Sequence, residues 1–403
     1  MMLCLTLLVV VALRSAAALE SIRSQTSLTF QDYVVQFQRS FHDSSEYAER
    51  QALFSKRLEF IRAHNSDPKR LWTAGINHFT DRTDAEFELL QGWRGQHGEA
   101  GNSVAVALIE EQSEHIWAPP VVEWSNLSAV ADSAMDQGSC GSCWAMAAAT
   151  MMEGRYEAQT RGKRSFSAQQ LVNCVKNPLE CGGTGGCSGA TVELALNYIQ
   201  SHGLRSNEDV PYVGEDRSCA DAEQPQSALL ALGHVNGQSV HLSGYRTLPS
   251  NKALPLMHSL TKGPVAISVG ASDWMVYSSG IFNGCVKDIV INHAVTLIGY
   301  GEEAGVHYWT VQNSWGTYWG EGGKIRLFRH PHPKGDEGYC GTDYHPDEGV
   351  SCKPYPEKVR VCGMCGLLYD AVEANFEKQG LLATGRKGQG QGRRNLKKQK
   401  KQK

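Results

Sequence analysis

One short segment combines the residue types that nucleophilic catalysis needs. Residues 137–144 contain two cysteines, Cys140 and Cys143, and the side-chain amide of Gln137. An Ala- and Met-rich helix is predicted to begin at Cys143 with Ser142 as its N-cap, which would place the sulfur near the positive end of the helix dipole. Such a position lowers the pKa of a thiol, so we predict that Cys143 is a thiolate nucleophile.

Two later segments offer groups that would activate this nucleophile. His293 precedes a strand-like apolar run, and Asn313 begins the segment Asn-Ser-Trp-Gly. Acyl transfer needs a base beside the nucleophile, a group that orients the base, and donors for the oxyanion. An Asn oxygen can accept from one imidazole nitrogen and leave the other facing a sulfur. Taken singly, His293, Asn313 and Gln137 are explained as well or better by structural roles, and only their combination with Cys143 predicts catalysis.

The composition indicates a globular protein with attachments. The chain has 403 residues, 41% hydrophobic and 20% charged, which is enough for one large core or two modest ones. Nine of the 39 Lys and Arg residues lie in the last twenty positions, and without them 30 basic residues face 42 acidic ones. This acidic body argues against nucleic-acid binding. We expect residues 371–403 to form a basic, disordered tail, with binding of the tail to a polyanion as the alternative.

The N-terminus predicts entry into the secretory pathway. An apolar run of about eleven residues, too short to span a bilayer, is followed by small residues, so we interpret residues 1–18 as a cleaved signal peptide. Outside the cytosol thiols pair, and loss of Cys4 with the signal leaves eleven of the twelve cysteines. The odd count predicts at least one free thiol.

Periodicity divides the rest of the chain. Residues 30–65 carry a helical pattern, and Gly-rich residues 91–104 suggest a linker before a second domain. Helices are then predicted from Cys143, from Ser167 with a capping box, and over residues 191–201. Strand-length apolar runs follow at residues 265–269, 294–300, 308–312 and 324–328. Helices first and strands later predict an α+β fold in two lobes.

These motifs resemble the papain family of cysteine proteases over roughly residues 30–369. The local signature of that family, Cys-Gly-Ser-Cys-Trp, begins at Cys140. The resemblance implies that Cys143 is the nucleophile and that Gln137 forms the oxyanion hole with the Cys143 N–H. It also implies a papain-like two-lobe fold, with a helical left lobe and a β-barrel-like right lobe.

The same resemblance assigns the remaining catalytic positions. His293 would act as acid and base, and Asn313 would orient it. Trp315 would shield the hydrogen bond between Asn313 and His293 from water.

The upstream segment resembles the inhibitory propeptide of cathepsin L-like members of the family. Its motif residues are Glu46, Arg50, Phe54, Ile61 and Asn65 on one helix face, then Gly75, Asn77, Phe79 and Asp81 in a turn-rich segment. Arg57 departs from the pattern, because the family has Asn there. The resemblance implies a zymogen: a propeptide at 19–117 fills the cleft in reverse and is released in acid, and a catalytic domain follows at 118–370.

Substrate contacts also follow from the resemblance. Ser188, Gly189 and Ala190 would pair with the substrate backbone, and Trp315 would border the site. The pocket for the second residue before the cut would be lined by Thr191, Val192, Ser268 and Ala294. These four side chains are small and uncharged. We expect the pocket to favour apolar side chains, since none of the four is an acid that could pair with an Arg.

The resemblance also assigns part of the disulfide framework. Cys140 would pair with Cys187, Cys174 with Cys219, and Cys285 with either Cys340 or Cys365. The surplus cysteines are Cys181, Cys352, Cys362 and the unused member of that pair, and five bridges would leave Cys143 free. Two alternatives remain open: a redox or zinc role for the Cys140-x-x-Cys143 pair, and a metal site at Cys362-x-x-Cys365.

The sequence therefore predicts a cysteine endopeptidase made as a zymogen, located in a lysosome or vacuole or outside the cell. Its expected partners are peptide substrates and its own propeptide, with no nucleic acid and no transmembrane span. We expect a monomer, and no metal or organic cofactor is implied. The alternative is a non-catalytic binder or inhibitor that acts through the propeptide-like segment.

Overall fold

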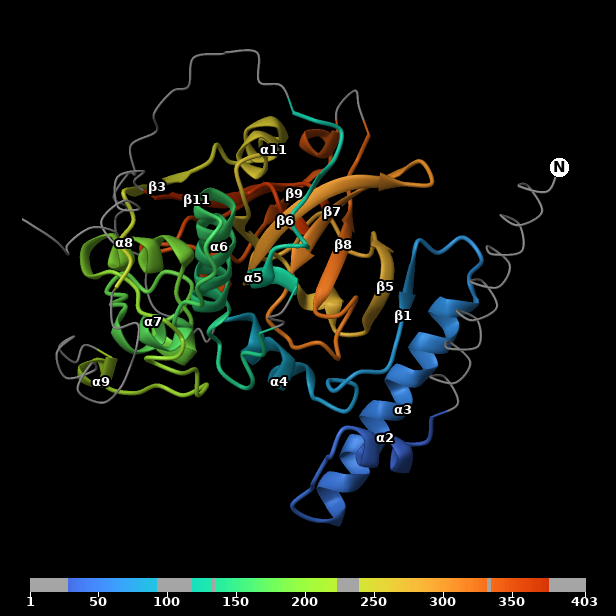
Figure 1. Cartoon of the computed structure of the whole chain (residues 1–403). Coiled ribbons are helices and arrows are strands. Elements are labelled where there is room, and N and C mark those ends of the chain that lie inside the picture. The colour runs from blue at the N-terminus through green and yellow to red at the C-terminus, as the bar shows by residue number, and fades with distance from the viewer. Residues whose placement is uncertain (1–27, 93–117, 132–134, 223–238, 332–334, 377–403) are drawn as a thin grey trace, which may run out of the picture.

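A buried helix forms the centre of the molecule. The computed structural model describes residues 28–92, 118–131, 135–222, 239–331 and 335–376. Helix α6, Cys143–Thr160, lies between a helical lobe and a β-rich lobe (Figure 1). Every residue of α6 from Cys143 to Arg155 is buried, and its many Ala residues let neighbouring elements pack closely. The predicted signal peptide at 1–18, most of the linker and the tail from 377 onward lie outside the described residues.

The helical lobe confirms the three helices predicted for it. Its elements besides α6 are α5 Ser128–Ala131, α7 Ala168–Cys174, α8 Val192–His202 and α9 Cys219–Ala222. The capping box predicted at Ser167 is only half formed. The Ser167 hydroxyl accepts the Gln170 N–H at 2.9 Å, but the Gln170 side chain donates to the Tyr198 hydroxyl and the Gly203 carbonyl instead of returning to Ser167. Hydrogen bonds from the Gln170 side chain to distant residues have therefore replaced its local bond to Ser167.

The β-rich lobe is a mixed sheet of nine strands over the described residues. The strand order is β1-β5-β8-β7-β6-β4-β11-β3, with β2 paired to β6. The strands are β1 Trp72–Ala74, β2 Val122–Glu123, β3 Gly244–Thr247, β4 Val265–Val269, β5 Tyr277–Phe282, β6 His293–Glu303, β7 Val306–Gln312, β8 Lys324–Phe328 and β11 Asp370–Asn375. The four predicted strands are present as β4, β6, β7 and β8. Strand β11 crosses the expected domain end at residue 370, because it pairs with β4 and β3 as far as Asn375.

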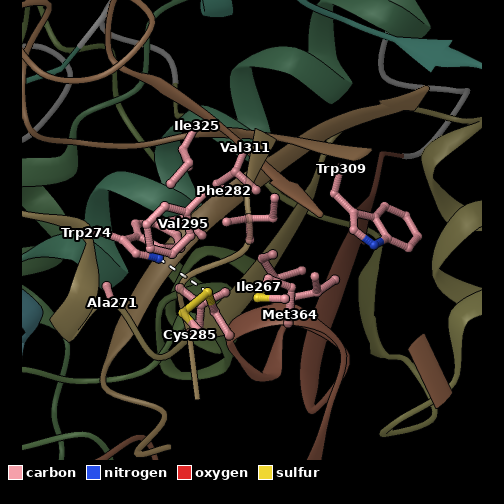
Figure 2. Close-up of a cluster of buried hydrophobic side chains, with 14 of the residues drawn as sticks. Ile267, Ala271, Trp274, Phe282, Cys285, Val295, Trp309, Val311, Ile325 and Met364 are labelled. Carbon is pink, nitrogen blue, oxygen red and sulfur yellow. Dashed lines mark hydrogen bonds between the residues drawn. A yellow bond between two sulfur atoms is a disulfide. The ribbon is translucent and has the colours of Figure 1, made fainter. Parts of the chain in front are cut away.

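The core of this lobe surrounds a disulfide. Figure 2 shows Trp274 above the Cys285 bridge, with Val295, Val311 and Ile325 of three neighbouring strands close by. The Trp274 indole N–H lies 3.4 Å from the sulfur of Cys365. Helix α11, Ala253–Leu260, and the small β9–β10 pair, Cys340–Asp343 and Val359–Cys362, complete the lobe.

An ion network joins the two lobes. The Arg155 guanidinium, fully buried on α6, lies 3.1 Å from the Glu373 carboxylate on β11 and donates to the carbonyls of Pro264 and Ala374. Glu373 also pairs with Arg246 of β3 at 2.9 Å. A buried charge of this kind is tolerated because all its donors have partners.

The N-terminal unit, residues 28–92, attaches to the edge of the sheet (Figure 1). The single helical pattern expected over residues 30–65 is two helices, α2 Phe30–Gln36 and α3 Ser44–Ser66. Asp43 begins the second helix by accepting the N–H groups of Ser45 and Glu46. Strand β1 then pairs antiparallel with β5, and α4, Asp84–Glu88, leads to a 3₁₀ turn at Leu89–Gln91.

Five disulfides connect the described cysteines. The pairs Cys140–Cys187 and Cys174–Cys219 are confirmed, and Cys285 pairs with Cys365, the second of the two open choices. The surplus cysteines form Cys181–Cys352 and Cys340–Cys362. Cys143 is the one free cysteine among the described residues. Because both Cys-x-x-Cys spacings are divided between separate bridges or a free thiol, neither forms a redox or metal pair here.

Replacement of Arg155 with Met should destabilise the protein more than loss of an exposed partner. The change removes the buried cation that pairs with Glu373 and leaves the Pro264 and Ala374 carbonyls without the Arg155 donor, which costs about 3–5 kcal/mol of unfolding free energy. Arg246→Met, whose side chain is 40% exposed, should cost about 1 kcal/mol or less. Urea unfolding of both variants, in a Cys143→Ala background that prevents autolysis, measures the difference; equal costs would contradict the role of Arg155.

Candidate active site

Cys143 lies where the two lobes meet. It is the first residue of α6, and the backbone N–H groups of Ala294 and Trp144 lie close enough to its sulfur to act against the rise that burial causes in its pKa. Ala294 follows His293, the first residue of β6. The sequence-predicted nucleophile and base are therefore brought together at the starts of two elements from opposite lobes. Ser142 occupies the N-cap position, but its hydroxyl pairs with the Tyr212 hydroxyl at 2.6 Å rather than capping the helix.

The imidazole of His293 is held on one side only. Its Nε2 lies 2.8 Å from the Asn313 side-chain oxygen, whereas its Nδ1 is buried without a hydrogen-bond partner. The Trp315 indole stacks on the imidazole with ring centroids 4.9 Å apart and is itself fully buried. This arrangement sets the tautomer of His293 and excludes water from the bond to Asn313.

Gln137 is fixed at the same site by the segment that follows Asn313. Its side-chain oxygen accepts the Ser314 hydroxyl at 2.6 Å, which leaves its amide nitrogen to donate. That nitrogen donates to the carbonyls of Leu90, at 2.8 Å, and Cys140, at 2.9 Å. A carbonyl of the N-terminal unit thus occupies the amide donor that the resemblance assigns to the oxyanion hole.

The N-terminal unit covers the nucleophile. A methyl group on Gly92 would come within 2.7 Å of the Cys143 sulfur, so only a glycine fits at this point. The Gly92 carbonyl packs on Gly189, where a methyl group would stand 1.5 Å from the oxygen and where φ is +91°. Asn292 holds the chain by donating to the Gln91 side-chain oxygen at 2.8 Å. The predicted backbone-binding residue Gly189 is therefore in contact with main chain in this state.

Burial beneath the N-terminal unit disfavours the charged forms of the Cys143 thiol and the His293 imidazole. It raises the pKa of the Cys143 thiol to about 11, and it lowers the pKa of His293 to about 4, although the Asn313 hydrogen bond acts in the opposite direction. The expectation of a lowered thiol pKa is wrong for this state. Desolvation outweighs the helix N-terminus here, so the pair is neutral while the N-terminal unit is in place.

The predicted pocket residues share one region, and two carboxyl groups that the sequence did not indicate lie beside them. Ala190, Thr191, Val192, Ser268 and Ala294 are all buried, from both lobes. The Ser268 hydroxyl donates to the Asp370 carboxylate at 2.6 Å, and burial together with the nearby Asp370 raises the pKa of Glu193. The four residues from which the sequence predicts an apolar pocket include neither carboxyl group. Asp370 is far away in sequence, and only its pairing with β4 places it there.

A strap, residues 349–352, borders the cleft on the side of this pocket. The Val350 N–H donates to the Ile291 carbonyl of the β-rich lobe at 2.9 Å, and the Ser351 carbonyl accepts the Gly182 N–H of the helical lobe at 3.1 Å. Cys352 is bonded to Cys181. Gly349 and Val350 line a small pocket together with Cys143, Gly182, Ala190, Asn292, Ala294 and residues 91 and 92. The strap therefore connects the lobes near the nucleophile.

The motif residues of the N-terminal unit hold it in shape and against the sheet. Arg50 pairs with Glu86, and Asn65 bonds both the N–H and the carbonyl of Ala74. Arg57, the departure from the family pattern, donates to Asp84 at 2.9 Å and to three carbonyls of the turn. Arg57 therefore connects helix α3 to the turn that follows β1.

Contacts to the β-rich lobe come from the same motifs. The Asn77 amide donates to the Met275 carbonyl at 2.7 Å. Phe79 and Phe87 pack edge-on against Trp315, with ring centroids 5.6 and 5.0 Å away. The indole that covers His293 is thus itself covered by the N-terminal unit.

Comparison with known proteins identifies both parts of the chain. Residues 118–346 match the papain family cysteine proteases, and residues 30–87 match the cathepsin propeptide inhibitor domain (I29). The chain belongs to the papain family of cysteine proteases. It is 33% identical over 295 residues to a cathepsin L-like proteinase of Fasciola hepatica, covering 72% of this chain and 84% of that one. The N-terminal unit is thus the folded part of an inhibitory propeptide.

Solved structures of precursors share the arrangement of the protease. A recombinant stem bromelain precursor aligns with TM-score 0.66 and 28% identity over 87% of this chain and 98% of its own. Digestive procathepsin L 3 of Tenebrio molitor larval midgut aligns with TM-score 0.63 and 25% identity over 88% and 99%. The papain-like α+β fold with a propeptide is therefore confirmed. Among the described residues, no helix is long and apolar enough to cross a membrane, and no group of His, Cys, Asp and Glu is arranged to hold a metal ion.

The thiol of the zymogen should react slowly. With a pKa of about 11, only about one Cys143 in ten thousand is a thiolate at pH 7. We expect alkylation by iodoacetamide at pH 7 to be at least about 100-fold slower in the zymogen than after propeptide removal. Mass spectrometry of the Cys143 peptide measures both rates, with Cys143→Ala as the control. Equal rates would show that the propeptide does not suppress ionisation.

His78 of the propeptide should make its binding sensitive to acid. Both ring nitrogens are buried without a partner, and burial lowers the pKa of His78 to about 4, with Asp136 and Asp81 acting against this and Arg82 and Arg39 adding to it. The bound state therefore favours neutral imidazole. Above pH 6.5 His78 is neutral in the free propeptide and does not oppose binding. As the pH falls from 6.5 towards 4, His78 must lose a proton to bind, so the affinity of the propeptide falls by up to about tenfold per pH unit.

Autoprocessing of the full chain tests this prediction. The processing rate should rise as the pH falls through this window, and His78→Gln should flatten the rise. His42→Gln is the matched control, because the His42 side chain is 93% exposed. Identical pH profiles for wild type and His78→Gln would assign the acid response to other groups.

Proposed function

We propose that Cys143, His293, Asn313 and Gln137 together hydrolyse internal peptide bonds once the propeptide has left. The observation that supports this proposal is that the His293 imidazole is hydrogen-bonded through only one of its two nitrogens. Asn313 holds Nε2 at 2.8 Å, and Nδ1 is left without a partner in a site that also contains the one free cysteine of the described residues.

The catalytic steps follow from this geometry. Removal of Gly92 rehydrates the site, so the proton of Cys143 passes to Nδ1 of His293 and the sulfur attacks the peptide carbonyl. The carbonyl oxygen becomes negative and accepts hydrogen bonds from the Cys143 N–H and from the Gln137 amide, which is now released from Leu90. His293 then donates its proton to the leaving amine, and a water that it deprotonates cleaves the thioester.

The neighbouring residues supply substrate binding in this proposal. Gly189 and Ala190 would pair with the substrate main chain, and Thr191, Val192, Ser268 and Ala294 would surround the second side chain before the cut. The contact between the Gly92 carbonyl and Gly189 supports this, because it is a main-chain contact at the same place. Trp315 would border the site through its stacking on His293.

The organisation of the chain follows the same reasoning. We propose a signal peptide at 1–18, a propeptide at 19–117, a catalytic domain from 118 that includes β11, and a basic tail after it. Five disulfides and the propeptide fit a protease of the secretory pathway, and we propose a lysosome, a vacuole or the extracellular space as its location, with the monomer as its working form. The relatives are proteases, and no observation favours the non-catalytic alternative.

Active-site variants test the proposal after an added protease has removed the propeptide and has itself been removed. Cys143→Ala should lower kcat/KM on a peptide substrate by at least about a thousandfold and abolish labelling by a thiol-directed epoxide. Asn313→Ala should lower kcat with little change in KM, because it acts by orienting His293. Ser139→Ala, an exposed neighbour, is the matched control and should behave as wild type. Labelling or hydrolysis that survives in Cys143→Ala would refute the proposal.

A further inference from the structure

One disulfide crosses from one lobe to the other. Two bridges lie within the helical lobe and two within the β-rich lobe, in the order Cys140–Cys187, Cys174–Cys219, Cys285–Cys365 and Cys340–Cys362. Cys181–Cys352 instead joins the loop that precedes Cys187 to the strap. In the part of the chain that the structure describes, this bridge is therefore the only disulfide that connects the lobes.

The strap end of this bridge belongs to the β-rich lobe. Cys352 lies in the segment between β9 and β10, and the Cys340–Cys362 bridge closes the base of that segment. Val350 packs against the core of the β-rich lobe, and its N–H donates to the Ile291 carbonyl at 2.9 Å. The strap thus moves with the β-rich lobe, and only its far end reaches the helical lobe.

The bridge lies at the wall of the catalytic cleft. Gly182, the neighbour of Cys181, and Val350, two residues before Cys352, line the small pocket that contains Cys143. The nucleophile and the base are positioned by other elements, because they are the first residues of α6 and β6. A change at the bridge should therefore alter the wall that a substrate contacts and leave the reacting groups in place.

The other contacts between the strap end and the helical lobe are main-chain or exposed. The Gly182 N–H donates to the Ser351 carbonyl at 3.1 Å, and the Lys353 N–H donates to the Leu179 carbonyl at 2.8 Å. Lys353 also pairs with Glu180, but these side chains are 34% and 40% exposed, so water competes for the pair. The bridge is therefore the principal restraint on the distance between the strap and this Gly-rich loop.

Cys352 is the accessible half of the bridge. It is an exposed residue, whereas Cys181 and the other eight bridged cysteines of the described residues are buried or half-buried. A thiolate in solution attacks a disulfide at the sulfur that it can reach, so Cys352 is the expected point of attack. Small thiols belong to the conditions of activity, because a thiolate nucleophile such as Cys143 becomes oxidised without them.

We infer that Cys352 is a site of exchange with low-molecular-mass thiols, and that opening of its bridge loosens the wall of the cleft. One thiolate attacks the Cys352 sulfur, forms a mixed disulfide there and expels the Cys181 thiolate. A second thiolate attacks the small-molecule sulfur and releases the Cys352 thiolate. The two small thiols leave as their own disulfide and supply the two electrons that reduce the bridge.

The order in which the bridges open tests the exchange. The full chain with Cys143→Ala is incubated with graded glutathione, free thiols are alkylated, and mass spectrometry quantifies each cysteine. Cys181 and Cys352 should be released, or Cys352 glutathionylated, at a glutathione concentration at least about tenfold lower than any other cysteine requires. Earlier opening of another bridge, or simultaneous opening of all five, would overturn the inference.

Kinetics of the mature enzyme test the effect on the cleft, and this part rests on the proposed function. Cys181→Ser/Cys352→Ser should raise KM for a peptide substrate by about three- to tenfold with kcat unchanged, because the strap must be ordered when the substrate binds. Glutathione should move wild type towards the same KM and leave the double variant unaffected. Cys174→Ser/Cys219→Ser, which opens a bridge within the helical lobe, is the matched control and should keep the wild-type KM.

Epoxide labelling of Cys143 counts the active sites in every sample, so that oxidation of the nucleophile is not mistaken for a change in the wall. A double variant with the wild-type KM, or one that still responds to glutathione as wild type does, would overturn the role of the bridge in the cleft. Failure of the proposed function would look different, because no sample would cleave the peptide while the order of bridge opening could still be measured.

Discussion

The structure depends on the meeting of two element starts, the first residue of α6 and the first residue of β6. Cys143 and His293 come from different lobes, so neither lobe alone contains a nucleophile beside a base. The Ala294 N–H that reaches the Cys143 sulfur marks this meeting, and the buried Arg155–Glu373 network holds the lobes in register behind it. Catalytic geometry here is a property of the interface between lobes.

The propeptide exploits the same interface by desolvating it. Gly92 lies against the Cys143 sulfur, and the Leu90 carbonyl accepts a hydrogen bond from the Gln137 amide. Two phenylalanines pack against Trp315. Inhibition is therefore both steric and electrostatic, because an uncharged thiol and an uncharged imidazole cannot begin the reaction. Arg57 shows that the propeptide tolerates change in its own helix, provided that the substituted side chain still reaches the carbonyls of the turn.

Two segments that carry surplus cysteines border one wall of the cleft. The loop that contains Cys181 and the segment between Cys340 and Cys365 are joined by the Cys181–Cys352 bridge, and together they carry the strap. The strap residues Gly349 and Val350 line the same small pocket as Cys143 and Ala294, so this wall lies directly beside the nucleophile.

The sequence by itself determined the family, the α+β order of elements and the candidate catalytic residues, because these depend on local motifs and on periodicity. Two disulfides followed only from the resemblance to the family. It could not decide whether Cys285 bonds Cys340 or Cys365, since spacing alone does not place two distant sulfurs together. Its expectation of a lowered Cys143 pKa is wrong for the propeptide-bound state, in which a distant segment lies over the sulfur and burial raises the pKa. Asp370 and Glu193 carry no local signal of their association; only the pairing of β11 with β4 and the packing of α8 bring the two residues near each other.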